Sequence, residues 1–124
     1  MLSIKNNAIT LTQGNSATIQ ISIMNEETGA PYILTNADYV LFTVKRTYNG
    51  AIRLQKRLTV LDYDEGGTLC CNLSADDTLS LVVDTYKYDC VLVSNDQVVT
   101  TFISSTLTIT GACGTINGGE NNGN

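Results

Sequence analysis

The segment Asp84-Thr85-Tyr86-Lys87-Tyr88-Asp89-Cys90 alternates polar and apolar side chains from Thr85 onward. Successive side chains of a β-strand point to opposite faces of its sheet, so this alternation predicts a strand with one buried and one solvated face. The buried face is expected to carry Tyr86, Tyr88, Cys90 and Leu92. The solvated face would then carry Thr85, Lys87 and Asp89.

Tyr88 and Cys90, with one residue between them, have the spacing of an immunoglobulin F strand and its tyrosine corner. An antibody-type domain also needs a second cysteine on the facing strand and a buried Trp. The alternating segment 16–24 has isoleucines at its inward positions instead, and the chain contains no Trp. We therefore expect an immunoglobulin-like sandwich without the disulfide.

Period-two alternation and turn signals such as Asn49-Gly50 recur along most of the chain, which predicts strands joined by short turns. The expected strands cover residues 9–12, 16–24, 39–46, 52–61, 68–73, 85–95, 98–103 and 106–110. A short helical turn is expected near residues 75–80, because Ser74 can cap it and Asp76 and Asp77 suit its first turn. The prediction is an all-β fold, an immunoglobulin-like antiparallel β-sandwich of about seven to nine strands, with a small Greek-key barrel as the alternative.

The chain has 124 residues, which suits one domain, and its composition changes near residue 110. Residues 1–110 are expected to form the sandwich. Residues 111–124 contain five Gly and four Asn, and only Ala112, Cys113 and Ile116 are apolar. Such a tail cannot bury enough surface to fold alone, so we expect a partner to order it.

Seven basic and twelve acidic residues give a net charge of −5, which disfavours nucleic acid and anionic membranes as partners. Five of the seven basic residues nevertheless lie close together in the sequence: Lys45, Arg46, Arg53, Lys56 and Arg57. The simplest interpretation is a solvated face on two neighbouring strands, and the alternative is a contact with an acidic protein surface. The sequence shows neither a secretory signal pattern nor an apolar run of membrane-spanning length, so we expect no membrane partner.

We expect no catalytic, cofactor-binding or metal-binding residues. The chain has no His, and Lys87 lies beside acids rather than in the apolar pocket that would lower the pKa of a lysine. Asp62-Tyr63-Asp64-Glu65-Gly66 resembles part of a calcium loop but lacks the later Glu, so a solvated hairpin turn is preferred and calcium is the alternative. The four cysteines match neither a disulfide framework nor a zinc-site spacing, which indicates free thiols in a reducing cytoplasm. They are Cys70, Cys71, Cys90 and Cys113.

Six segments share their order and spacing with one known protein family. They are Ile9-Thr10-Leu11-Thr12-Gln13-Gly14-Asn15-Ser16-Ala17, Gly29-Ala30-Pro31-Tyr32-Ile33-Leu34, Val40-Leu41-Phe42-Thr43-Val44-Lys45, Leu73-Ser74-Ala75-Asp76-Asp77-Thr78-Leu79, Tyr86-Lys87-Tyr88-Asp89 and Ser105-Thr106-Leu107-Thr108-Ile109-Thr110. Together they span about residues 8–110 and resemble the N-terminal immunoglobulin-like domain of phage baseplate upper proteins. The family often has a Gly just before the Tyr-x-Tyr strand, where this chain has Asp84-Thr85.

The resemblance implies a non-enzymatic structural protein of a phage virion, made in the bacterial host cytoplasm and placed in the baseplate or tail. It also implies that the partners are other virion proteins, and we expect contacts with copies of the chain itself. Larger family members continue into a helical linker, whereas this sequence ends in the Gly/Asn tail, so a head-decoration protein on the same fold is one alternative. A carbohydrate- or host-surface-binding module is another, in which Tyr48 or Tyr63 would contact the sugar.

Overall fold

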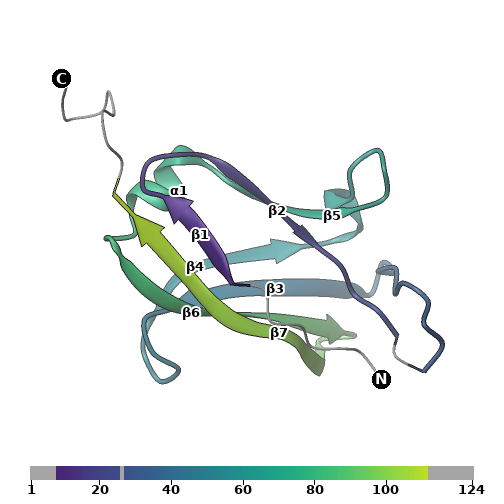
Figure 1. Ribbon diagram of the computed structural model, residues 1–124. Helices are drawn as coiled ribbons and strands as arrows, with labels where there is room; N and C mark the ends of the chain where they lie inside the picture. Colours follow the sequence, from purple (N-terminus) through teal and green to yellow (C-terminus); the bar gives the residue numbers. More distant parts are fainter. Residues whose placement is uncertain (1–7, 26, 112–124) are drawn as a thin grey trace.

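The computed structural model describes residues 8–25 and 27–111, and within these ranges the chain is an all-β sandwich of two unequal sheets (Figure 1). Of the expected tail, residues 111–124, all but Gly111 lie outside the described residues. The strands are β1 (Ile9–Thr12), β2 (Ala17–Ile21), β3 (Asp38–Lys45), β4 (Ile52–Leu58), β5 (Leu69–Leu73), β6 (Asp84–Ser94) and β7 (Gln97–Thr110). A 3-10 turn, η1 (Val60–Asp62), follows β4, and the short helix α1 (Ala75–Leu79) follows β5.

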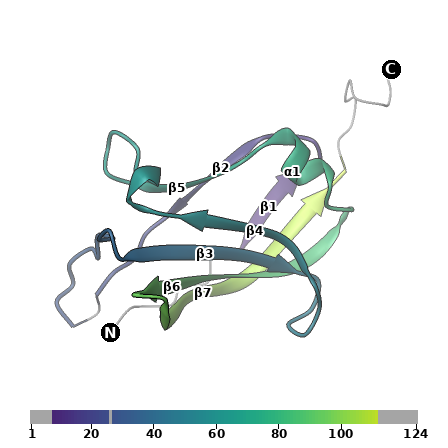
Figure 2. The ribbon, with the colours of Figure 1, turned by 180° about the vertical axis from the view of Figure 1, so that it is seen from behind.

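The larger sheet has the strand order β1-β7-β6-β3-β4, and the smaller sheet pairs β2 with β5 (Figures 1 and 2). All neighbouring strands are antiparallel except β1 and β7, which are parallel. The described strands thus form two separate sheets, which confirms the predicted sandwich rather than the closed barrel. The predicted helical turn is confirmed as α1, while the two strands expected at 98–103 and 106–110 are one continuous strand, β7.

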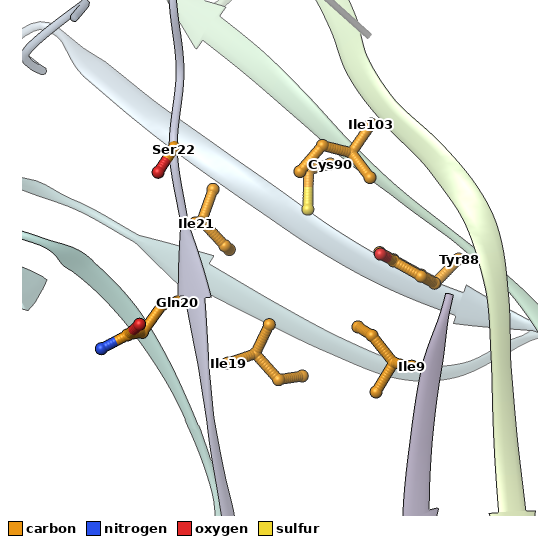
Figure 3. Close-up of a pocket in the computed structure, with 8 residues that line it drawn as sticks. All are labelled: Ile9, Ile19, Gln20, Ile21, Ser22, Tyr88, Cys90 and Ile103. Atoms are coloured by element: carbon orange, nitrogen blue, oxygen red, sulfur yellow. The ribbon is translucent and has the colours of Figure 1, made fainter. Parts of the chain in front are cut away.

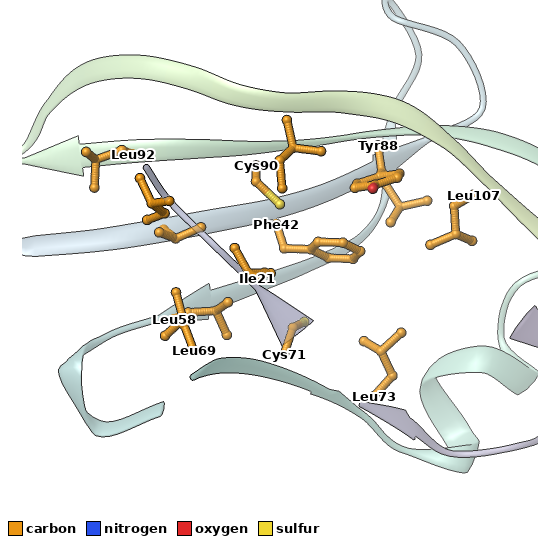
Figure 4. Packing of buried hydrophobic residues seen from close by; sticks show 14 of the residues in the cluster. Ile21, Phe42, Leu58, Leu69, Cys71, Leu73, Tyr88, Cys90, Leu92 and Leu107 are labelled. Atoms are coloured by element: carbon orange, nitrogen blue, oxygen red, sulfur yellow. The ribbon is translucent and has the colours of Figure 1, made fainter. Parts of the chain in front are cut away.

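The core fills the space between the sheets, and its centre is the ring pair of Phe42 and Tyr88 (Figure 4). The two ring centroids are 5.3 Å apart with an interplanar angle of 36°, which is a favourable tilted arrangement. The four residues expected on the inner face of β6 are all buried: Tyr86, Tyr88, Cys90 and Leu92. From the smaller sheet, Leu69, Cys71 and Leu73 pack against them. The period-two prediction for β6 is therefore confirmed.

The corner between α1 and β6 is fixed by a tyrosine. Tyr86 is 2% exposed, and its Oη donates a hydrogen bond to the Val82 carbonyl oxygen at 2.7 Å. This is the hydrogen bond of a tyrosine corner. The spacing between Tyr88 and Cys90 indicates Tyr88 as the corner residue, but the bond is made by Tyr86, near the start of the strand. Tyr88 lies deeper in the core, against Phe42.

Helix α1 closes the side of the sandwich between β4 and β5. Ser74 Oγ accepts a hydrogen bond from the Asp77 N–H at 3.1 Å, and the Asp77 carboxylate accepts one from the Ser74 N–H at 2.8 Å, a complete capping box. The same carboxylate lies 2.8 Å from Lys56 Nζ. Lys56 interrupts the apolar face of its strand in the sequence, and this ion pair explains how it is accommodated.

Replacing Tyr86 by Phe should lower the free energy of unfolding by about 0.5–1.5 kcal/mol, because the corner hydrogen bond is lost while the ring stays. Urea unfolding measures the change. The matched control is Tyr48→Phe, whose side chain is largely exposed and whose hydroxyl removal should change stability by less than about 0.5 kcal/mol. Equal stability of Tyr86→Phe and the unmodified chain would show that the corner bond contributes nothing.

Asp77→Asn should destabilise the chain by about 0.5–1 kcal/mol at neutral pH, because it removes the negative charge beside Lys56 and at the start of α1. The hydrogen bond from Lys56 holds the pKa of Asp77 below its ordinary value of 3.8, so this stabilisation is complete above that value and is lost as the pH falls through the lowered pKa. The difference between the variant and the unmodified chain, measured by urea unfolding, should therefore vanish in acid. Asp76→Asn, in the same helical turn, is the control; an equal cost at Asp76 would exclude the contribution of Lys56.

Candidate protein-binding surface

Two lysines face each other across neighbouring strands on the outer face of the larger sheet. In the β3–β6 register, Lys45 is directly opposite Lys87. Side chains directly opposite each other in an antiparallel pair are about 5 Å apart at Cβ, and like charges there are destabilising. Neither ammonium takes part in an ion pair within residues 8–25 and 27–111. The pair is thus a local concentration of positive charge that forms no ion pair within these ranges, with Asp89 as the nearby acid that interacts with Lys45.

An exposed aromatic ring lies next to this pair. Tyr48, in the loop between β3 and β4, is 65% exposed, and Lys87 Nζ lies 5.7 Å from the centre of its ring. A small hollow of about 40 Å³ is lined by Thr43, Lys45, Tyr48, Lys87, Tyr88 and Asp89. Burial raises the pKa of Asp89, and the positive charge of Lys45 opposes that shift. The hollow has room for a small group such as a carboxylate.

The three arginines of this region differ in the groups that contact them. The Arg46 guanidinium binds the Asp84 carboxylate, with Nε to Oδ2 at 2.9 Å, and this pairing lowers the pKa of Asp84. Arg57 lies over the ring of Tyr39 at 3.8 Å, a cation–π contact. Arg53 is exposed, and among the described residues no carboxylate forms an ion pair with it. The predicted charged face on β3 and β4 is therefore present, and β6 extends it.

The proposed calcium-type turn uses its carboxylates for local hydrogen bonds. Asp62 Oδ2 accepts from the Thr59 N–H at 2.7 Å, which caps η1, and Asp64 Oδ1 accepts from the Thr68 N–H at 2.9 Å. The bond from Thr68 is the main reason that the pKa of Asp64 is lowered. Within the described ranges, no group of three or more His, Cys, Asp or Glu side chains is placed to hold a metal ion.

Three of the four cysteines are described, and all three are free and buried: Cys70, Cys71 and Cys90. Burial raises the pKa of the Cys71 thiol to about 12 and that of Cys90 further, so both are protonated and weakly nucleophilic at neutral pH. Alternation along β5 predicts that Cys70 faces outward when Cys71 faces the core. It does point away from the core side of β5, but residues of the preceding turn cover it, and its Sγ lies 3.7 Å from Asp64 Oδ2.

The two tyrosines that could contact a sugar lie in different environments. Tyr48 is exposed, as such a role requires. Tyr63 packs against the core, and its hydroxyl accepts a hydrogen bond from the Leu34 N–H at 3.0 Å. Tyr63 therefore holds the loop before β3 in place, which leaves Tyr48 as the exposed aromatic platform of the two.

A groove that the sequence does not indicate lies between β1 and β2 (Figure 3). Its volume is about 360 Å³, and it is lined by Ile9, Ile19, Gln20, Ile21, Ser22, Tyr88, Cys90 and Ile103. The groove exists because β1 joins β7 in the larger sheet, while β2, the next strand along the chain, joins β5. Local alternation predicts both strands but not their separation into different sheets.

No helix in the described part of the chain is long and apolar enough to cross a membrane.

Replacing Lys45 by Gln should stabilise the chain by about 0.2–1 kcal/mol at low ionic strength, because the repulsion from Lys87 is removed. The gain should disappear in concentrated salt, where the screening length falls to about 3 Å at 1 M. Urea unfolding at both ionic strengths measures it, with Arg53→Gln as the control. A gain at Lys45 that persists in salt, or an equal gain at Arg53, would contradict the repulsion between the two lysines.

No protein-family model matches this sequence, and no curated protein matches it.

Proposed function

We propose that the chain is a non-enzymatic structural protein of a bacteriophage virion, a baseplate or tail-associated module that acts through protein–protein contacts. The observation that carries the proposal is the opposed pair of Lys45 and Lys87, which forms no ion pair among the described residues, beside the exposed ring of Tyr48. Like charges held opposite each other weaken the folded chain, so their presence is best explained by a partner that supplies negative charge.

The chemistry of this surface favours a protein partner over other classes. Its Tyr and Arg side chains are the types enriched at protein interfaces, and its charge is local rather than spread over the molecule. The net charge of −5 opposes nucleic acid and anionic membranes as partners. Together with the resemblance of residues 8–110 to a phage assembly module, this supports a place in the virion and synthesis in the host cytoplasm. A head-decoration protein would use the same kind of contact at a different position in the particle.

A carbohydrate- or host-surface-binding module is the second candidate, and the observation that favours it is the exposed ring of Tyr48. An aromatic face can stack on a sugar ring. A glycan array separates the two functions: reproducible sugar binding that Tyr48→Ala abolishes would favour the second candidate, and an array without binding favours the first.

Lys45→Glu/Lys87→Glu should reduce the number of copies in purified particles by about tenfold, equivalent to a loss of about 1.4 kcal/mol in binding. The test expresses the variant in the host during infection by a phage whose own copy of the gene is deleted, and quantifies the chain in particles by mass spectrometry. The control variant, Thr10→Glu/Gln20→Glu, places two exposed acids away from the lysine pair and should be incorporated normally. Absence of the unmodified chain from purified particles would overturn the proposed function, and normal incorporation of the lysine variant would exclude this surface.

A further inference from the structure

The two ends of the sandwich carry opposite charge. The long strands β3, β4 and β6 run side by side, so the connecting loops gather at the two ends (Figures 1 and 2). Residues 59–68, which follow β4, and residues 95–96, which join β6 to β7, lie at the same end, because Asp38 pairs with Ser94 and Val40 with Leu58. These loops contain no Lys or Arg, and the cation beside them is Arg57 of β4, which shares a hollow with Asp96. We call this the acidic end, and its carboxylates are Asp62, Asp64, Glu65 and Asp96.

The opposite end holds the loop of residues 46–51 between β3 and β4, together with the start of β6. We call it the basic end, because its cations Lys45, Arg46, Arg53 and Lys87 outnumber its two acids, Asp84 and Asp89. Only Arg46 of these four cations has an ion-pair partner in the part of the chain that the structure describes, namely Asp84. The acids of α1 lie on the side of the smaller sheet, where Asp77 is engaged by Lys56. Three cations at this end thus remain available to a partner.

The loop of the basic end has a defined shape. The Gly50 N–H donates to the Thr47 carbonyl oxygen at 3.0 Å, which closes the turn beside Tyr48. A Cβ atom at Gly50 would lie 2.9 Å from Thr47 Oγ1, so a side chain at this position would displace Thr47. The turn therefore holds Tyr48 in a fixed place next to Lys87, and a binding partner meets a preformed surface.

Each end also presents a large exposed apolar or aromatic side chain. Leu61 at the acidic end is 88% exposed, in the η1 turn next to Asp62, and Tyr48 at the basic end is 65% exposed. An exposed apolar side chain at an end rich in carboxylates can pack on an exposed aromatic ring at an end rich in cations, with the charges at the rim of the contact. One chain thus carries both halves of a complementary interface, at opposite ends.

We infer that the acidic end of one copy binds the basic end of a second copy, head to tail. This inference rests on the proposed function, and it names a second copy of the chain as the partner of the basic surface. The carboxylates of the second copy would pair with Lys45 and Lys87, which face each other and form no ion pair among the described residues of the single chain. A head-to-tail contact leaves one unused end on each side, so it continues into a ring or a filament, as a repeated virion component requires.

The test is sedimentation velocity of the full chain over a range of concentrations at low and high ionic strength. We expect association at low ionic strength that is lost in concentrated salt, because the screening length shortens from about 10 Å at 0.1 M to about 3 Å at 1 M. The basic-end variant Lys45→Glu/Lys87→Glu and the acidic-end variant Glu65→Lys/Asp96→Lys should each raise the dissociation constant by about tenfold or more. Circular dichroism confirms that both variants fold, and Thr10→Glu/Gln20→Glu should associate as the unmodified chain does.

The deciding measurement mixes the two end variants. Each variant alone presents the same sign of charge at both of its ends. In an equimolar mixture, the unchanged acidic end of one variant can meet the unchanged basic end of the other, so association should return. A mixture that stays monomeric, or association that neither variant weakens, would overturn the inference. An unmodified chain that is monomeric at all concentrations but present in particles would also overturn it, while leaving the proposed function intact with a different virion protein as partner.

Discussion

The packing of the small β2–β5 sheet on the inner face of the large one is the constraint on which the rest of the structure depends. Two strands alone are marginal in water, so β2 and β5 persist only through the apolar surface they share with β3, β6 and β7. Phe42 and Tyr88 form the centre of that shared surface. Because most of the inner face is buried in this core, the surfaces open to a partner are the outer faces of the two sheets, the groove between β1 and β2, and the loops at the two ends.

The elements that could be predicted from the sequence are those whose cause is local. Alternation across residues 84–92 places Tyr86, Tyr88 and Cys90 in the core, and Ser74 with Asp77 marks the start of α1, because both patterns act within a few residues. The choice of Tyr86 over Tyr88 for the corner bond could not be predicted, since it depends on where the chain re-enters the sheet after α1. The parallel pairing of β1 with β7 joins residues about a hundred positions apart, and no local pattern contains it.

The candidate surface could likewise be predicted only in part from the sequence. The cluster of basic residues at 45–57 is visible in the sequence, but the addition of Lys87 to it requires the β3–β6 register. Asp62, Asp64 and Glu65 are neighbours in the sequence, but the addition of Asp96 to them follows from the directions of β4 and β6. A chain with a net charge of −5 thereby presents a basic surface of its own, and this is the surface that we propose binds an acidic partner.

We propose that the chain works as a repeated unit of a particle, joined through its two charged ends. Electron cryomicroscopy of the purified phage, with the sandwich located in the density, tests it most directly. We predict neighbouring copies related head to tail, with the loop containing Tyr48 of one copy against the turn containing Leu61 of the next. A particle that lacks the chain, or one in which both ends of every copy face solvent, would contradict the account.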